Sequence, residues 1–295
     1  MNVIKNRYIF LSVSAFIVIA SWVCIFVFGL RPGIDLRGGT QWIFQLPEVQ
    51  ISEYDLGVLL SELSGSDVSV KKTDDGDFLA KLPDISEENH QRYLLGVVQK
   101  FGEVKEKSFS SIGPTIGSEL REKSILAIFA VLFGISLYIA WAFRKVSRPI
   151  KSWKYGLVTL LTLFHDVSIP TGFLAVLGYT SGIEIDTNFI VALLVVMGFS
   201  VHDTIVVFDR IRENILVMRG KNFLLADVIN RSIRETIMRS INTSLTLVFV
   251  LLTILFFGPS SLFYFMLTIL IGTIVGTYSS IFIASSFLFI WNKEK

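Results

Sequence analysis

Residues 198–214 read GFSVHDTIVVFDRIREN, and they join an apolar segment to a charged one. The preceding residues 189–197 are wholly apolar, whereas the stretch ends in acidic and basic side chains. Asp203 interrupts the apolar part, and a charge at the centre of a membrane helix costs about 2.5 to 3.5 kcal/mol. A carboxylate kept at that cost serves a partner, a proton or a substrate, or it forms a structural polar contact between helices.

The composition is that of a polytopic membrane protein. The chain has 295 residues, of which 52% are hydrophobic, and its mean hydropathy is +0.61. The net charge of +2 gives no indication of nucleic-acid binding. Cys24 is the only cysteine, so neither a disulfide framework nor a cysteine-based metal site can form within one chain.

Six segments are long enough to cross a bilayer, which requires about 20 residues. They lie near residues 8–28, 125–143, 155–177, 189–208, 241–257 and 262–290. The first segment is too long for the hydrophobic part of a signal peptide and lacks a small-residue cleavage site at its end. We therefore expect it to be an uncleaved membrane anchor.

The distribution of positive charge predicts the topology. Lysine and arginine gather before the first span, between the second and third, between the fourth and fifth, and after the last, whereas the loops 178–188 and 258–261 contain neither. Because positive charge favours the cytoplasmic side, both termini are predicted to be cytoplasmic and residues 31–123 to lie outside. The basic residues concerned are Lys5, Arg7, Arg144, Lys145, Arg148, Lys151, Lys154, Arg210, Arg212, Arg219, Lys221, Arg231, Arg234, Arg239, Lys293 and Lys295.

The outside region is predicted to be an α+β domain. Strands are expected near residues 40–46, 67–72, 77–82 and 103–109, and helices at 52–63 and 87–101 begin after the capping residues Ser52 and Ser86. Asp74-Asp75-Gly76 predicts a turn. The order strand, helix, strand, strand, helix, strand is that of a ferredoxin-like domain. The expected organisation is a tail and first span (1–30), this domain (31–123) and a five-helix membrane region (124–295).

The opening stretch resembles the fourth membrane segment of the SecF branch of the SecD/SecF family, within the RND superfamily. The family pattern is glycine, an aromatic residue, serine, two variable residues, aspartate, threonine and an apolar run into DRIREN. SecD members usually have glutamate at the positions of Asp209 and Asn214, so this segment resembles SecF more than SecD. The matching residues are Gly198, Phe199, Ser200, Asp203, Thr204, Asp209, Arg210, Arg212, Glu213 and Asn214.

Two glycine-rich stretches match the same family. Residues 33–40, GIDLRGGT, resemble the family's stretch just after the first span, although Leu36-Arg37 follows the SecD version. Residues 112–117, IGPTIG, resemble the stretch before the second span. Neither has the spacing of a phosphate-binding loop, and we interpret both as hinges. The hinge residues are Gly33, Gly38, Gly39, Gly113, Pro114 and Gly117.

The resemblance implies half of an RND-type transporter that drives late steps of protein export across the bacterial cytoplasmic (inner) membrane with the proton-motive force. SecD would supply the pseudo-symmetric half and SecYEG the channel. Other auxiliary Sec subunits and exported unfolded polypeptides are further expected partners. Protons are the expected coupling ion, and no other cofactor, metal, nucleic acid or enzymatic chemistry is expected.

The residues expected to couple protons lie in the membrane spans. Asp203 is predicted to carry the proton with Arg239 as its partner, because antiparallel fourth and fifth spans place both near one depth; pairing would hold the carboxylate ionised and its loss would favour protonation. The alternative for Arg239 is a side chain that extends to the cytoplasmic interface. Gly198 and Ser200 are small enough for a neighbouring helix to approach, and His202 should point about 100° away from Asp203.

His165-Asp166, near the middle of the third span, forms a second candidate pair, for which the alternative is a polar contact that packs the bundle. The chain has three histidines, His90, His165 and His202, and His90 lies in the outside domain. A zinc site is therefore not expected. Gly272 and Gly276 form a G-x-x-x-G motif, which predicts close helix packing within the bundle or against a partner.

Two other functions stay open. A small-molecule or lipid exporter of the RND class usually carries two six-helix repeats and two outside domains, whereas this chain has one of each. An intramembrane hydrolase needs a nucleophile beside its base, which His165-Asp166 lacks. Asp166 and Asp203 could form a protease dyad, but they lie on different helices without flanking glycine motifs.

Overall fold

The computed structural model describes residues 2–46, 51–66, 68–73, 76–145, 150–218 and 223–292. Asp74 and Asp75 of the predicted turn lie outside the described residues, as do five of the basic residues used for the topology: Arg148, Arg219, Lys221, Lys293 and Lys295. The chain divides into two units. We call Met1–Arg31 with Ile125–Lys295 the membrane unit, and Pro32–Ser124 the α/β unit.

The described residues contain six helices long and apolar enough to cross a membrane, which confirms the predicted number of spans. The C-terminal end of α7 and the N-terminal end of α8 extend beyond the predicted spans. Charged residues in these extensions form ion pairs within and between the two helices. The elements are α1 (Arg7–Phe28), α5 (Pro114–Ala142), η1 (Phe143–Lys145), α6 (Ser152–Ser181), α7 (Thr187–Val217), α8 (Leu225–Phe257), η2 (Ser260–Leu262), α9 (Phe263–Tyr278), the π-helical η3 (Ser279–Ile283) and α10 (Ala284–Ile290).

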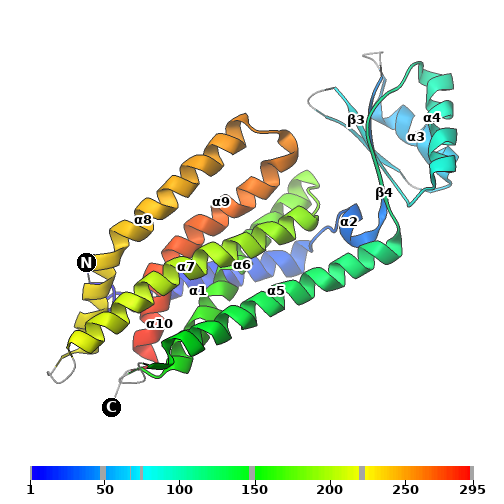
Figure 1. The fold of residues 1–295 in the computed structure, drawn as a ribbon. Helices are drawn as coiled ribbons and strands as arrows, with labels where there is room; N and C mark the ends of the chain where they lie inside the picture. Colours follow the sequence, from blue (N-terminus) through cyan, green and yellow to red (C-terminus); the bar gives the residue numbers. More distant parts are fainter. Residues whose placement is uncertain are drawn as a thin grey trace. The chain divides into compact units, whose positions relative to one another are not determined.

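Helices α6, α7 and the last span form the interior of the membrane unit. About half of their apolar windows is buried (56%, 50% and 50%), against 11% in α1 and α5 and 17% in α8. Figure 1 shows α7 and α9 running side by side. Polar residues on the buried faces of these inner helices are therefore shielded from the surroundings of the bundle.

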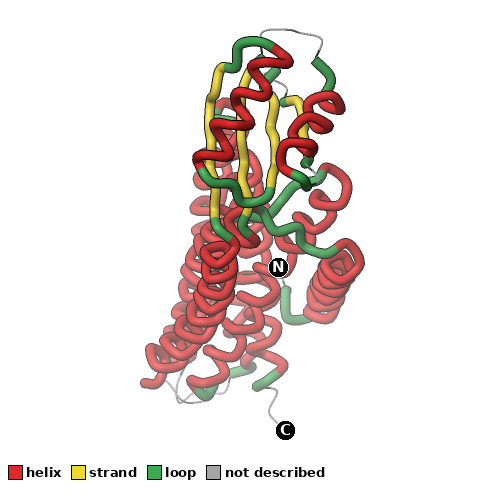
Figure 2. Tube along the Cα trace, turned by 90° about the vertical axis from the view of Figure 1, so that its right-hand side faces the viewer, coloured by secondary structure: helices red, strands yellow, loops and turns green. Residues whose placement is uncertain are grey.

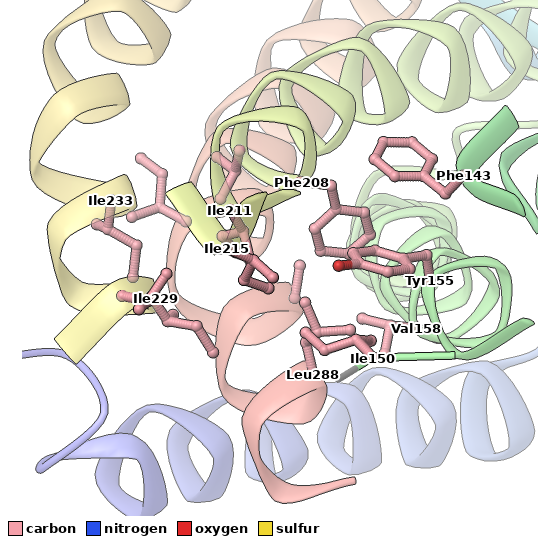
Figure 3. Close-up of a cluster of buried hydrophobic side chains, with 14 of the residues drawn as sticks. Phe143, Ile150, Tyr155, Val158, Phe208, Ile211, Ile215, Ile229, Ile233 and Leu288 are labelled. Carbon is pink, nitrogen blue, oxygen red and sulfur yellow. The ribbon is translucent and has the colours of Figure 1, made fainter. Parts of the chain in front are cut away.

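One cluster of buried apolar side chains ties the helices together near the α7–α8 connection. Tyr155 of α6 lies edge-on to Phe208 of α7, with ring centroids 5.1 Å apart (Figure 3). Ile229 of α8 and Leu288 of α10 belong to the same cluster. The N-terminal residues join it as well, because the backbone N–H of Ile4 donates to Asn230 Oδ1 at 3.1 Å.

Small residues let α7 and α9 approach closely. A Cβ atom added at Gly272 would lie 2.2 Å from Val196 Cγ2, and one at Gly276 would lie 2.9 Å from Ser200 Cβ. The predicted packing role of the G-x-x-x-G motif is thus confirmed, and the contact lies within the bundle. The expectation for Gly198 was wrong: nothing lies within 4 Å of a Cβ there, because Gly198 is on the exposed side of α7 and the approach occurs on the Ser200 face.

The α/β unit has the predicted ferredoxin-like topology. Its four strands are antiparallel in the order β2-β3-β1-β4, and α3 and α4 lie on one face of the sheet (Figure 2). The predicted caps are confirmed, since Ser52 accepts from the N–H of Tyr54 and Ser86 from that of Asn89. The elements are α2 (Ile34–Arg37), β1 (Gly39–Gln45), α3 (Glu53–Ser64), β2 (Ser69–Lys72), β3 (Phe78–Leu82), α4 (Glu87–Phe101) and β4 (Lys105–Ile112).

Trp42 and Phe44 of β1 are fully buried beneath the two helices and form the centre of this domain. Strand β4 runs to Ile112, beyond the predicted end at residue 109, because its last residues pair with the start of β1. The sequence did not predict α2, a single turn that precedes β1.

Candidate functional site

Asp166 of α6 is the most completely enclosed carboxyl of the membrane unit, with none of its surface exposed. His165 Nδ1 lies at a hydrogen-bond distance of 2.8 Å from Asp166 Oδ1. Asp166 Oδ2 accepts hydrogen bonds from Ser200 Oγ and, at 2.8 Å, from Ser279 Oγ. The carboxyl therefore joins α6, α7 and η3, and both of its oxygens are satisfied, as a buried charge or polar group requires.

The π-helical segment η3 brings Ser279 to this carboxyl. The segment inserts between α9 and α10, and such bulges often occur at functional sites. Ser279 Oγ also lies 3.1 Å from the carbonyl oxygen of Gly276, one turn earlier. On α6, Pro170 has no N–H to donate to the carbonyl of Asp166, so one intrahelical hydrogen bond is missing at this level.

Asp203 of α7 is buried as well, at 2% exposure, but it is less completely bonded. Ser240 and Ser244 of α8 face its carboxyl. Nevertheless, Asp203 Oδ2 and Ser240 Oγ are both buried without a hydrogen-bond partner among the described residues. One oxygen of this carboxyl is thus available to a proton or to a partner.

The two carboxyls are connected through α7. Ser200 binds Asp166 and lies three residues before Asp203, so both side chains occupy one face of the helix. Thr204 Oγ1 donates to the carbonyl of Ser200 at 3.1 Å. On the other side of Asp203, Ser244 Oγ and Thr277 Oγ1 are hydrogen-bonded at 2.6 Å and join α8 to α9. Hydroxyl groups therefore line the interior on both sides of Asp203.

The expected ion pair between Asp203 and Arg239 does not form in this structure. Arg239 is exposed on α8 and, in the described part of the chain, makes no ion pair with Asp203; only its charge acts on that carboxyl at longer range. The reason is helical geometry: Ser240, the next residue, occupies the inner face of α8 and directs Arg239 outward. His202 is exposed too, which agrees with its predicted direction away from Asp203.

The charged end of the opening stretch forms a polar network between α7 and α8. Glu235 is its centre: its Oε2 accepts from Arg210 Nε at 2.6 Å and from Asn214 Nδ2 at 2.8 Å, and its Oε1 accepts from Arg231 Nε at 2.8 Å. Arg210 also pairs with Glu213, and Asp209 pairs with Arg212, 2.7 Å apart. These residues join the ends of the two helices, a structural role that needs no substrate.

The two glycine-rich stretches meet inside the α/β unit. Gly38 has φ +83°, and a Cβ there would lie 2.6 Å from Pro114 Cα. A Cβ at Gly117 would lie 2.4 Å from the backbone N of Gly38. Gly39 also has a positive φ, of +130°, whereas Gly33 caps α2 and Gly113 lies beside Asp84. The glycines thus allow α5 to begin against the α2–β1 corner; their role as hinges stays a prediction.

Sequence reasoning missed Ser279, Ser240, Ser244 and Glu235. Ser240 and Ser244 are spaced four residues apart in an apolar helix, which is a signal for a polar face. Ser279 lies in a long apolar span as part of a Ser-Ser pair. Neither pattern indicates which carboxyl these serines face, Asp203 for Ser240 and Ser244 or Asp166 for Ser279. Among the described residues, no group of three or more histidine, cysteine or acidic side chains could hold a metal ion.

These features define a class: a polytopic membrane protein with buried carboxyls on its inner helices and a ferredoxin-like domain between its first two spans. Residues 95–294 match the family described as protein export membrane protein SecD/SecF, C-terminal, and residues 25–41 match the SecD/SecF GG motif. The chain belongs to the SecD/SecF family.

Individual relatives agree with this membership. The protein translocase subunit SecF of Thermobaculum terrenum is 40% identical over 100% of this chain and 95% of its own length. That of Anaerolinea thermophila is 35% identical over 99% of this chain. The crystal structure of SecDF, a translocon-associated membrane protein from Thermus, has a TM-score of 0.84 at 31% identity, and it covers all of this chain but 39% of the SecDF chain.

Proposed function

We propose that this chain is an auxiliary subunit of the Sec protein translocase that acts in late steps of protein export. The full-length similarity to subunits named SecF supports this role. The similarity to about two fifths of a SecDF chain supports a SecD-like partner. The SecYEG channel, other auxiliary Sec subunits and exported unfolded polypeptides complete the proposed partners. The proposed location is the bacterial cytoplasmic membrane with both termini cytoplasmic, on the distribution of lysine and arginine.

In this proposal, protons are the coupling ion and Asp203 carries them. The observation that supports it most is the buried Oδ2 of Asp203 on an inner helix, which has no hydrogen-bond partner in the part of the chain that the structure describes. An unpaired charge in a low-dielectric site is costly, so the protonation state of such a carboxyl is sensitive to small rearrangements. The membrane potential supplies about 2.3 kcal/mol per charge per 100 mV, which is enough to bias a conformational change of a few kcal/mol.

Arg239 is proposed to act in another step of the cycle. From its exposed position it would reach Asp203 only after α8 rotates relative to α7, because Ser240 now occupies the inner face. Pairing would then release the proton, and separation would allow the next one to bind. Asp166 with His165 is the second proposed proton site, and His202 is proposed to modulate Asp203 through its charge.

The test uses inverted membrane vesicles that contain the translocase and its SecD-like partner. Asp203→Asn keeps the shape of the side chain and removes its ionisation. We expect it to leave the protein folded and bound to its partner but to abolish the stimulation of export by a proton gradient. Asp227→Asn, at an exposed position in the first turn of α8, is the matched control and should retain full stimulation.

Full stimulation in the Asp203→Asn variant would refute the role of Asp203, and Asp166→Asn would then be tested. The same vesicles distinguish the proposed function from the alternative, an exporter of small molecules or lipids. Such an exporter would move its substrate without any Sec channel. Hydrolytic chemistry is not proposed, since Ser200 donates to the Asp166 carboxyl rather than to an imidazole that could act as its base.

A further inference from the structure

The α/β unit contains a groove between α3 and the edge strand β2. It has a volume of about 710 Å³ and opens to the surroundings of the domain. Tyr54, Gly57 and Val58 line it on the helix side, and Val68 and Val70 line it on the strand side. Most of the groove's lining is apolar, and Glu53 and Glu62 of α3 also line it.

The strand edge in this groove is only partly blocked. Strand β2 pairs with β3 on one side and is the first strand of the sheet. On its outer side, the N–H of Lys72 donates to Glu53 Oε1 at 2.7 Å, and the N–H of Val68 donates to Ser61 Oγ at 3.2 Å. Side chains of α3 thus occupy two outer donors of the edge, as proteins often do to prevent unwanted strand pairing.

Val70 lies between these two blocked positions. Because backbone groups alternate sides along a strand, the N–H and C=O of Val70 point outward like those of Val68 and Lys72. Among the described residues, no hydrogen-bond partner meets Val70 on that side. An open backbone pair therefore faces the groove at its middle.

Gly57 keeps the groove open opposite Val70. A Cβ at this position would lie 3.8 Å from the carbonyl oxygen of Val68 and 3.9 Å from Val70 Cγ2, so an alanine would fit at ordinary contact distance. Glycine in the middle of a helix is unfavourable relative to alanine, and no positive φ requires it here. Beside it, Tyr54 is 77% exposed although it is large and aromatic.

We propose that this groove binds an extended polypeptide segment that pairs with Val70 as an added strand. Backbone pairing supplies sequence-tolerant affinity, and alternate side chains of the ligand enter the groove. Apolar ligand side chains would pack on Gly57 and Tyr54, and basic ones would face Glu53 and Glu62. The occupant is therefore an unfolded segment with apolar and basic residues, and this identification rests on the proposed role in protein export.

The experiment measures binding of a fluorescent nine-residue peptide of alternating isoleucine and lysine to the full-length protein in nanodiscs. Three probes serve as controls: the same peptide N-methylated at its central residues, which removes backbone donors; a peptide with glutamate in place of lysine; and the free fluorophore. We expect saturable binding of the first peptide and at least about tenfold weaker binding of the N-methylated and acidic peptides.

Two variants address the groove directly. Gly57→Leu fills it and should weaken binding at least about tenfold, whereas Gly57→Ala should stay within about twofold of the wild type. Val70→Pro removes the outward N–H, which an edge strand tolerates, together with the valine side chain that lines the groove, and should weaken binding about three- to tenfold. Circular dichroism with thermal unfolding verifies that each variant is folded.

Unchanged binding in folded Gly57→Leu and Val70→Pro variants would overturn the proposal, as would no saturable binding to the wild type at about 1 mM peptide. Self-association that Gly57→Leu abolishes would identify a second copy of the chain as the occupant and would also overturn it. Peptide binding needs no proton gradient, so its failure leaves the proposed export function standing. Conversely, if the Asp203→Asn variant loses gradient-stimulated export but still binds the peptide, only the coupling of protons to export is affected.

Discussion

Asp166 and Asp203 illustrate how two buried carboxyls in one bundle can differ. Asp166 has bonds from His165, Ser200 and Ser279 on both oxygens, whereas Asp203 has one buried oxygen without a partner among the described residues. A fully bonded carboxyl fixes the helices around it, and an incompletely bonded one is free to change its proton or partner. In the proposed cycle Asp203 is therefore the first candidate for coupling, whereas Asp166, the second candidate, also holds the inner helices together.

The hydroxyl of Ser279 should contribute to the stability of the bundle. Ser279→Ala removes one donor to Asp166 Oδ2, and we expect the free energy of unfolding to fall by about 1 to 2 kcal/mol. Ser280→Ala is the matched control, because Ser280 Oγ donates only to the carbonyl of Thr277, and its effect should stay below about 0.5 kcal/mol. Unfolding in detergent measures both, and equal effects would contradict the assigned bond.

Among the helices, α7 and α9 form a close contact on which the site depends, because Ser200 lies against Gly276 and binds Asp166. Glycine is required there by space rather than by backbone conformation, since neither Gly272 nor Gly276 has a positive φ. The contact therefore fixes both the packing of α7 and the position of its polar face.

Gly272→Ala and Gly276→Ala should each destabilise the protein by about 1 to 3 kcal/mol, because the new methyl group collides with Val196 or Ser200. Gly198→Ala, on the open side of α7, should be neutral or stabilising by up to about 1 kcal/mol through helix propensity. Thermal unfolding of the purified protein measures the three variants. A destabilisation by Gly198→Ala as large as the others would show that space at the contact is not the cause.

The network around Glu235 should hold the ends of α7 and α8 together. Glu235→Gln weakens its contacts with Arg210 and Arg231, and we expect faster amide hydrogen exchange in the adjoining turns of both helices, equivalent to about 0.5 to 1 kcal/mol of local stability because the pairs are partly exposed. Glu213→Gln loses one exposed pair and should change exchange little. Equal exchange in both variants would refute the central role of Glu235.

Considered as a whole, the chain combines a six-helix membrane unit with a ferredoxin-like domain inserted between its first two spans. The exposed apolar side chains concentrate on α1, α5 and α8, the outer helices, as expected for surfaces that contact lipid or another subunit. The proposed topology places the α/β unit outside and the α7–α8 connection in the cytoplasm, and this can be tested without a functional assay.

Single-cysteine variants in a Cys24→Ser background provide that test. Tyr54→Cys in the α/β unit and Leu224→Cys before α8 both introduce the thiol at exposed positions. In right-side-out vesicles, a membrane-impermeant maleimide should label only the Tyr54→Cys variant, because charge bias places the other position inside. Labelling of both after detergent treatment is the control. Labelling of the Leu224→Cys variant in intact vesicles would reverse the proposed topology.

The sequence by itself determined the number of spans, the ferredoxin-like order and the helix caps. These features depend on local periodicity, apolar length and capping chemistry, which the chain carries in consecutive residues. It also located Asp203, because one carboxylate in an apolar run is conspicuous in any membrane segment.

Only the tertiary structure decided which groups meet. Ser279 reaches Asp166 from more than a hundred residues away along the chain through a π-helical segment, and no local pattern encodes that register. Arg239 has the charge to pair with Asp203, yet the rotation of α8 places Ser240 inward and Arg239 outward. The physical reason is that local sequence sets the period of each helix, whereas the packing of neighbouring helices sets its rotation and therefore its contacts.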